Sequence, residues 1–88
     1  MTYRLSRQAI SDIKAIYHYT VKYFGEGQAQ EYLGGLDYSF DLLTDNPKIG
    51  HAVDGKRRRY VYREHLVYYR IIKKEILITH IRHGRMKP

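Results

Sequence analysis

The feature that most constrains the fold is a series of three strand-like runs in the second half of the chain. They cover residues 57–63, 66–72 and 76–81, and the two later runs are rich in isoleucine, leucine and tyrosine. Residues 64–65 and 73–74 are predicted as turns between them. A parallel crossover needs a dozen or more residues, so these runs are predicted to pair as an antiparallel meander.

A short strand and a helix are predicted at the N-terminal end. Residues 2–5 carry apolar side chains at every second position, which is typical of an edge or terminal strand. Ser6 suits the N-cap of a helix to about Phe24, because its hydroxyl can accept a backbone N–H of the first turn. Gly25 stands where an αL helix cap is expected. Apolar side chains of this helix recur along one stripe at Ile10, Ile13, Tyr17 and Phe24.

A second helix is predicted from about residue 26 or 27 to residue 44, where Asn46 and Pro47 end it. A glycine turn of two or three residues would make the two helices an antiparallel hairpin. Gly34 and Gly35 each cost up to about 1 kcal/mol in a helix interior, so we expect close approach of the neighbouring helix as compensation, or else a weak spot. The apolar face of the second helix consists of Tyr32, Leu36, Phe40 and Leu43.

These elements predict an α+β domain with the order β-α-α-β-β-β, in which a helical hairpin packs on one face of an antiparallel sheet. Residues 48–56 are expected to form a loop, because glycines interrupt any periodicity there. A chain of 88 residues builds a single core, so residues 1–88 form one domain.

The composition argues against several classes of protein. Without cysteine there is no disulfide framework and no thiolate ligand or nucleophile, which fits a reducing compartment. His80 and His83 are three residues apart and so face opposite sides of a strand, which argues against a shared metal site. No segment resembles a signal peptide or approaches the roughly 20 apolar residues that span a bilayer. We therefore expect a soluble cytoplasmic protein with no cofactor, no metal and no membrane partner.

The net charge of +7 is concentrated in one half of the chain. Residues 1–44 contain four Lys or Arg and five Asp or Glu, a net charge of −1. Residues 45–88 contain twelve and four, a net charge of +8. A basic half on so small a domain predicts an anionic partner, either nucleic acid or an acidic protein surface, with a membrane face as the less favoured alternative.

The densest run of charge, residues 56–59, is followed by tyrosines at positions 60, 62, 68 and 69. Basic and aromatic side chains together can hold phosphates and stack bases of single-stranded nucleic acid. The alternative for Arg57 and Arg58 is a charged edge strand that prevents aggregation. Arg70 lies within an apolar strand, so it either faces the uncovered side of the sheet as a binding residue or forms a structural salt bridge. His83 could be a general acid or base, or an exposed histidine without such a role.

Three stretches carry a resemblance to a known family: AISDIKAIYHYT, LLTDNPKIG and the closing HGRM. The chain resembles, over essentially its full length, the ParE toxins of the RelE/ParE toxin–antitoxin superfamily. The resemblance implies the β-α-α-β-β-β fold, a bacterial cytoplasmic toxin, and a ParD-like antitoxin encoded beside it, with which the toxin forms a hetero-oligomer.

The same resemblance leaves more than one activity open. RelE-like members are ribosome-dependent endoribonucleases, in which a tyrosine or histidine near the C-terminus assists proton transfer, whereas ParE-like members inhibit DNA gyrase. This chain has no terminal tyrosine, and only His83 could replace it. The resemblance therefore favours gyrase inhibition without catalysis, with nucleic acid reached only through gyrase. The alternatives are an mRNA endoribonuclease acting through Arg59, Arg70 and His83, and a plain nucleic-acid-binding module.

Two sets of residues are expected to form the binding surfaces. The surface for the target is predicted to consist of Arg57, Arg59, Arg70, His83, Arg85 and Met86, converging on the uncovered side of the sheet and the tail. The antitoxin is expected to lay an amphipathic segment into a groove. Candidates for that groove, which could equally be core residues, are Tyr17, Tyr32, Leu36 and Phe40.

Overall fold

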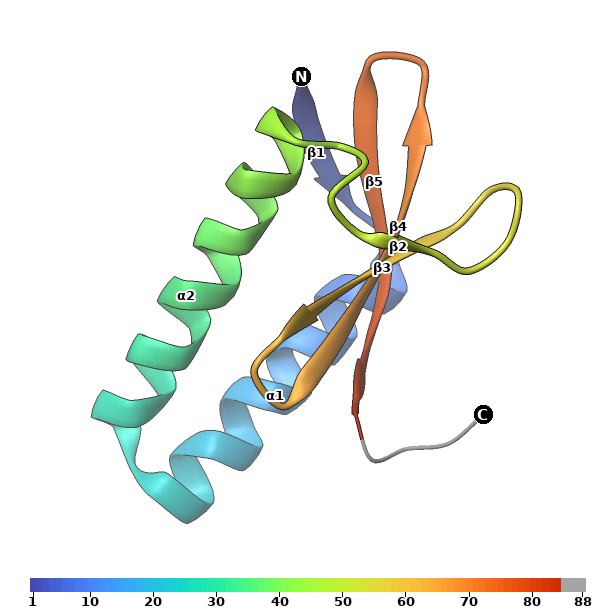
Figure 1. Cartoon of the computed structure of the whole chain (residues 1–88). Helices are drawn as coiled ribbons and strands as arrows, with labels where there is room; N and C mark the ends of the chain where they lie inside the picture. The colour runs from blue at the N-terminus through green and yellow to red at the C-terminus, as the bar shows by residue number, and fades with distance from the viewer. Residues whose placement is uncertain (85–88) are drawn as a thin grey trace.

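The structure is a computed structural model that describes residues 1–84, and it has two helices and five strands (Figure 1). In chain order these are β1 (Thr2–Leu5), α1 (Arg7–Phe24), α2 (Glu26–Asp45), β2 (His51–Ala52), β3 (Arg58–Tyr62), β4 (His65–Ile72) and β5 (Glu75–His83). The predicted order of elements is confirmed. The one addition is β2, a two-residue strand within the segment that was predicted as loop.

The five strands form one sheet in the order β1-β5-β4-β3-β2. The meander of β3, β4 and β5 is antiparallel as predicted. In contrast, β1 pairs with β5 in the parallel direction, so the sheet is mixed rather than wholly antiparallel. The chain between β1 and β5 contains both helices and the strands β2 to β4, and this length allows the parallel direction that a short turn forbids.

The two helices are joined by a single residue, Gly25. It ends α1 and precedes α2, so the connection is shorter than the predicted turn of two or three residues, and Gly27 lies inside α2. Gly25 has φ 90° and ψ 165°, a backbone conformation that favours glycine but is not the αL cap expected from the sequence.

Both helices cover the same face of the sheet, here called the inner face, and the opposite face is called the outer face. Alternate residues of β4 and β5 point to the inner face, where Val67, Tyr69, Ile76 and Ile78 are buried against the helices. Figure 1 shows α1 and α2 on one side of the strands. The largest fully buried side chains of this core are Tyr69, Leu36, Leu43, Ile76, Ile78 and Val67.

A β-bulge at Thr79 interrupts the pairing of β4 with β5. Tyr68 pairs with His80 and Tyr69 with Ile78, so Thr79 has no partner in register. The start of α1 satisfies backbone groups at and beside this bulge. The Ser6 hydroxyl donates to the Thr79 carbonyl oxygen at 2.6 Å, and the Ser6 N–H donates to the Ile78 carbonyl oxygen at 3.0 Å.

Two further hydrogen bonds complete this junction. The Ser6 Oγ accepts the Ala9 N–H at 3.0 Å, which is the N-cap predicted from the sequence. The Asp12 carboxylate accepts the Ile81 N–H at 2.8 Å. The first turns of α1 are therefore bonded directly to the bulged segment of β5.

Gly35 allows a side chain of β3 to approach α2. A Cβ at Gly35 would overlap the Tyr62 Oη, and that hydroxyl donates to the Tyr32 carbonyl oxygen at 2.8 Å. A Cβ at Gly34 would meet no atom within 4 Å. The close approach expected at the glycine pair therefore involves Gly35 and a strand, not the neighbouring helix.

Replacing Ser6 by alanine is expected to lower the free energy of unfolding by about 1–2 kcal/mol, since it removes the helix cap and leaves the Thr79 carbonyl without its donor. The matched control is Ser11→Ala, on the exposed surface of α1, which should stay within about 0.5 kcal/mol of the wild type. Urea denaturation followed by circular dichroism measures both. Equal stabilities of the two variants would contradict the role given to Ser6.

The glycine pair offers a second matched comparison by urea denaturation. Gly35→Ala should destabilise the fold by about 1–3 kcal/mol, because the added methyl group overpacks against Tyr62. The higher helix propensity of alanine offsets part of this loss. Gly34→Ala should stabilise it by up to about 1 kcal/mol, because the position is open. Adding Tyr62→Phe to Gly35→Ala should recover part of the loss. A Gly35→Ala variant as stable as Gly34→Ala would show that Tyr62 moves away without cost.

Candidate functional site on the outer sheet face

Four side chains form a row across the outer face, here called the outer row: His51, Arg59, Tyr68 and His80. His51 pairs with Arg59, Arg59 with Tyr68, and Tyr68 with His80, so each stands directly opposite the next. Directly paired residues project to the same side of a sheet. Since Val67 on β4 is buried under the helices, the outer row lies on the uncovered side.

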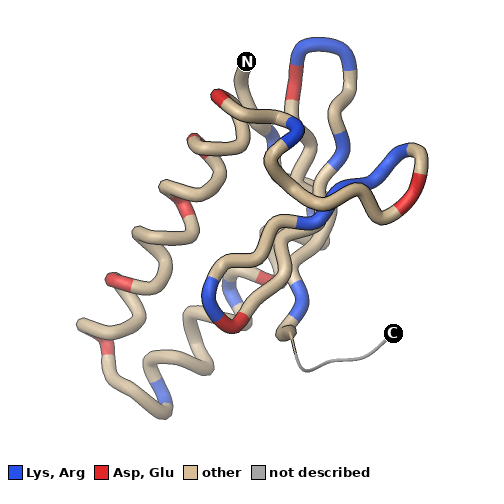
Figure 2. Tube along the Cα trace, viewed as in Figure 1, with Lys and Arg blue, Asp and Glu red and all other residues tan. Residues whose placement is uncertain are grey.

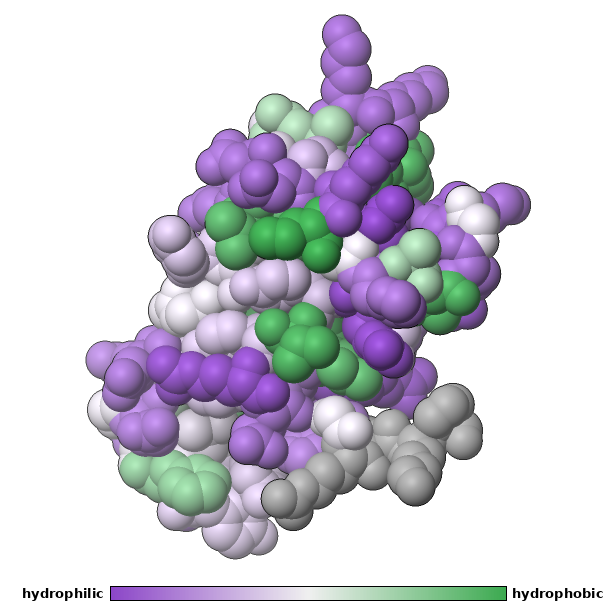
Figure 3. Space-filling view, in the orientation of Figure 1, coloured by the Kyte–Doolittle hydropathy of each residue, from purple (hydrophilic) through white to green (hydrophobic). Residues whose placement is uncertain are grey.

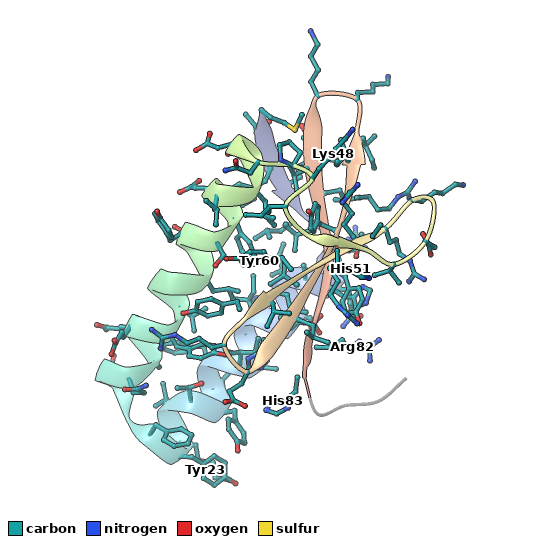
Figure 4. All side chains as sticks on the ribbon, viewed as in Figure 1. Tyr23, Lys48, His51, Tyr60, Arg82 and His83 are labelled. Atoms are coloured by element: carbon teal, nitrogen blue, oxygen red, sulfur yellow. The ribbon has the colours of Figure 1, made fainter. Side chains whose placement is uncertain are left out.

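Further basic residues flank the outer row on the same face. Arg70 of β4 pairs with Leu77, which pairs in turn with Arg4 of β1. Arg82 of β5 is exposed and pairs with Leu66. In Figure 4, Tyr60 lies between the sheet and α2, whereas Arg82 extends from the other side of the sheet. The outer face therefore carries several arginines around the paired rings of Tyr68 and His80.

The bulge determines which residues of β5 belong to this face. Ile76 and Ile78 point inward, and regular alternation would send His80 and Arg82 inward too. Because Thr79 is an extra residue, Ile81 takes the next inward position, and it is buried. His80 and Arg82 were not among the residues predicted for the target surface. The sequence does contain a sign of the bulge. The apolar residues stand at the even positions 76 and 78 and then at the odd position 81, so the alternation shifts by one residue.

The outer row is held by packing as well as by backbone pairing. The rings of Tyr68 and His80 are stacked, with centroids 4.4 Å apart and an angle of 11° between their planes. Burial, and secondly the positive charge of Arg82, lowers the pKa of His80, which favours the neutral ring. The Nε atom of Arg59 is buried and has no hydrogen-bond partner.

Few carboxylates neutralise the arginines of this face. Within residues 1–84 the ion pairs are Arg4 with Glu75 and Arg57 with Asp54. Neither pair involves the arginines at 59, 70 or 82. Lys and Arg gather on the strands and their turns, while Asp and Glu recur along α2 (Figure 2). The two layers of the molecule thus carry opposite charge.

The loop before β3 is organised by Asp54. Its carboxylate accepts the backbone N–H groups of Lys56 and Arg57 and pairs with the Arg57 guanidinium at 3.0 Å. These interactions, the backbone hydrogen bonds first, lower the pKa of Asp54 to about 2. Arg57 is therefore engaged within its own loop, but it also lines a cavity together with Arg70. Its place in the target surface stays a prediction.

The other predicted target residues are divided between the two faces. Arg59 and Arg70 lie on the outer face, where the prediction placed them. His83 pairs with His65 at the end of the inner face, so the expected convergence of all these residues on one surface is wrong for His83. Arg85 and Met86 lie outside the residues that the structure describes.

Arg58 and most tyrosines near the basic run have structural roles. The Arg58 guanidinium donates to the carbonyl oxygens of Lys48 and Gly50, at 3.2 and 2.7 Å. Tyr62 and Tyr69 are buried on the inner face. Of the four tyrosines considered as platforms for bases, the outer row contains only Tyr68.

A second polar cluster joins α2 to the ends of β4 and β5. The Tyr32 hydroxyl lies 2.7 Å from the His65 Nδ1 and accepts the Glu64 N–H at 3.3 Å. The rings of His65 and His83 are 5.3 Å apart. Burial, and secondly the charge of His83, lowers the pKa of His65, while burial raises the pKa of Tyr32. His65 was predicted to lie in a turn, and this cluster was not predicted from the sequence.

Three of the four residues predicted for an antitoxin groove are core residues. Tyr32, Leu36 and Phe40 are 8%, 1% and 3% exposed, since the apolar face of α2 packs on the sheet. Only Tyr17 is partly accessible. The expectation of an open groove lined by all four must therefore be corrected.

Within residues 1–84 no group of three or more His, Asp and Glu side chains could hold a metal ion. Over the same residues, no helix has the length and apolar character needed to cross a membrane.

The fold is similar to that of a chain in the solved structure of the chromosomal ParDE TA system from P. aeruginosa. The two chains superpose with a TM-score of 0.83 over 94% of this chain and 95% of the other, at 23% sequence identity. The chain therefore has the RelE/ParE-like α+β fold.

The amino-acid sequence identifies the family. Residues 3–88 match the family model described as the ParE toxin of the type II toxin–antitoxin system parDE. The chain belongs to this family. It is 32% identical to Toxin ParE1 of Caulobacter vibrioides, covering 85% of this chain and 82% of that protein. It is 31% identical to Toxin ParE1 of Mycobacterium tuberculosis, covering 96% and 90%.

The lowered pKa values of His65 and His80 predict that acidification destabilises the fold. In the unfolded chain these two histidines are protonated with the ordinary histidine pKa of 6.5, whereas in the folded chain they are protonated only at lower pH. The free energy of unfolding should therefore fall as pH drops below about 6.5 and level off below the folded pKa values. Asp54, with a pKa of about 2, does not contribute in this interval.

Urea denaturation at about pH 7.5 and about pH 5.5 measures this effect. The double variant His65→Asn/His80→Asn should lose less stability between the two conditions than the wild type. A wild type that keeps or gains stability on acidification would contradict the assignment.

Proposed function

We propose that this chain is the toxin of a type II toxin–antitoxin pair, that it inhibits DNA gyrase and thereby blocks replication, and that a ParD-like antitoxin neutralises it. The observation that carries the proposal is the ParE family match over residues 3–88. The toxin acts as an inhibitor that binds its target, and its outer face needs no catalytic group for this role.

The arrangement of the predicted catalytic residues supports inhibition over RNA cleavage. A nuclease acting through Arg59, Arg70 and His83 would need all three around one phosphodiester. Arg59 and Arg70 lie on the outer face, whereas His83 pairs with His65 at the end of the inner face. His80, which does share the outer face, is the histidine that such a nuclease would have to use instead.

The target surface is proposed to be the outer face around Arg59 and Arg70, with Arg82 added by the structure. Arginines without a carboxylate partner form strong bidentate contacts with the carboxylates of an acidic protein surface. Their fixed positions on paired strands also reduce the entropy lost when a partner binds.

The antitoxin is proposed to bind the helical hairpin. Tyr19, Tyr23 and Phe24 near its tip are 60%, 59% and 66% exposed, and the rings of Tyr19 and Tyr23 are 4.7 Å apart. Tyr23 is labelled at this end of the molecule in Figure 4. Elsewhere, the face shown in Figure 3 has hydrophobic areas separated by hydrophilic surface. An amphipathic segment that lies on this side of α1 would bury the rings of Tyr19 and Tyr23.

A supercoiling assay with purified gyrase and relaxed plasmid tests the proposal. The full chain should inhibit supercoiling, and cleaved DNA should accumulate. Prior addition of the ParD-like antitoxin encoded beside the toxin should prevent both effects. The double variant Arg59→Ala/Arg70→Ala should inhibit roughly tenfold less, since an exposed charge contact contributes up to about 1 kcal/mol. The control Lys74→Ala, in the exposed turn before β5, should inhibit like the wild type.

Gyrase that remains active at excess toxin would overturn the proposal. Cleavage of ribosome-bound mRNA, lost in His80→Ala or His83→Ala, would establish the nuclease alternative.

A further inference from the structure

A basic cavity lies at the edge of β4. Pairing between β3 and β4 ends at Arg58 and Tyr69, and within the described residues no strand follows on that side of residues 70–72. The loop between β2 and β3 lies beside this open edge. The cavity has a volume of about 320 Å³ and is lined by Lys48, Lys56, Arg58 and Arg70, with Asp54 and small or apolar residues. A second cavity of about 360 Å³ shares Lys56 and Arg70 with it.

The cations of this cavity exceed its available negative charge. Among the described residues, Asp54 is the one carboxylate that lines the cavity. Its oxygens already accept the backbone N–H groups of Lys56 and Arg57 and a hydrogen bond from the Arg57 guanidinium. Within residues 1–84 neither of the two ion pairs includes Lys48, Lys56 or Arg70. A concave site with this balance concentrates anions, and phosphate oxygens are the acceptors that such cations bind well.

An aromatic platform lies beside the cavity. Tyr68 precedes Arg70 by two positions on the same face of β4, so their backbones are roughly 7 Å apart along the strand. Tyr68 is stacked on His80, and the lowered pKa of His80 favours a neutral ring. Because the two rings are stacked face to face, each covers one face of the other. The opposite face of a ring, on an open sheet face bordered by Arg59 and Arg82, can stack an unpaired base.

We propose that the outer face binds single-stranded nucleic acid directly, with one phosphate in the cavity around Arg70 and a base stacked on the Tyr68–His80 pair. An acidic peptide could bind the cations, but it has no base to stack on the Tyr68–His80 pair. In a duplex the bases are stacked on one another and are not available to the rings. A single strand offers both groups together. This binding does not depend on gyrase as the target of the toxin.

Fluorescence anisotropy with a labelled oligothymidylate of about 15 nucleotides tests the proposal on the full chain. Tyr68→Thr, which keeps a β-branched residue in the strand, should weaken binding roughly 5- to 150-fold. Tyr68→Phe should bind like the wild type, because the ring is kept. Arg70→Ala should weaken binding and reduce the slope of log affinity against log salt concentration by about 0.7.

The control variants Lys14→Ala on α1 and Lys74→Ala in the turn before β5 remove one exposed charge each away from the site. Both should bind the oligonucleotide nearly as the wild type does. An abasic strand of equal length should bind as weakly as oligothymidylate binds to Tyr68→Thr, and inorganic tripolyphosphate should compete only weakly.

Three results would overturn the proposal. The first is no binding by the wild type at low salt. The second is an equal loss in the control variants and in Arg70→Ala, which would indicate nonspecific attraction by net charge. The third is equal affinity for the abasic strand, which would exclude stacking on Tyr68. Melting curves of Tyr68→Thr and Arg70→Ala establish that both variants are folded. Because gyrase is absent from this assay, its outcome is separate from that of the supercoiling assay.

Discussion

The bonding of α1 to the bulge in β5 is the interaction on which the arrangement of the molecule depends. The Ser6 hydroxyl caps the helix and also binds the Thr79 carbonyl, and Asp12 binds the N–H of Ile81. These bonds fix the extra residue in place, so β5 can bury Ile81 and still present His80 on the outer face. A regular strand would bring polar side chains under the helices, where a charge without a partner is costly. The core and the outer face are therefore consequences of the same junction.

Tyrosine hydroxyls connect the core to the backbone around α2, which explains part of the high tyrosine content. The Tyr62 hydroxyl donates to the Tyr32 carbonyl, and the buried Tyr69 hydroxyl donates to the Pro47 carbonyl while accepting the Gly50 N–H. Each ring fills the core and its polar end satisfies a backbone group that would otherwise be buried without a partner. The inner tyrosines are thus structural, and they leave Tyr68 as the tyrosine of the outer row.

Local patterns in the sequence predicted the elements well, because helix periodicity, the Ser6 cap and short turns act within a few residues. Features that depend on distant partners were missed or misassigned. The parallel pairing of β1 is made across almost the whole chain, and the outward direction of His80 depends on α1. The apolar face of α2 shows a further limit, since its periodicity is the same whether it packs on the sheet, as Leu36 does, or binds a partner. The division of Arg70 and His83 between two faces likewise required the strand register.

The opposite charges of the two layers give the molecule an electric dipole moment. Five exposed acidic residues lie on α2, which has no lysine or arginine, and the cations lie mainly on the sheet and its loops (Figure 2). In the electric field of a polyanion, such a dipole orients the molecule so that the sheet faces the polyanion and α2 faces away from it. Encounters would then begin with the outer face already oriented toward the polyanion, and their rate would fall as salt screens the field. The helical hairpin would remain on the far side, open to a second protein while the sheet is occupied.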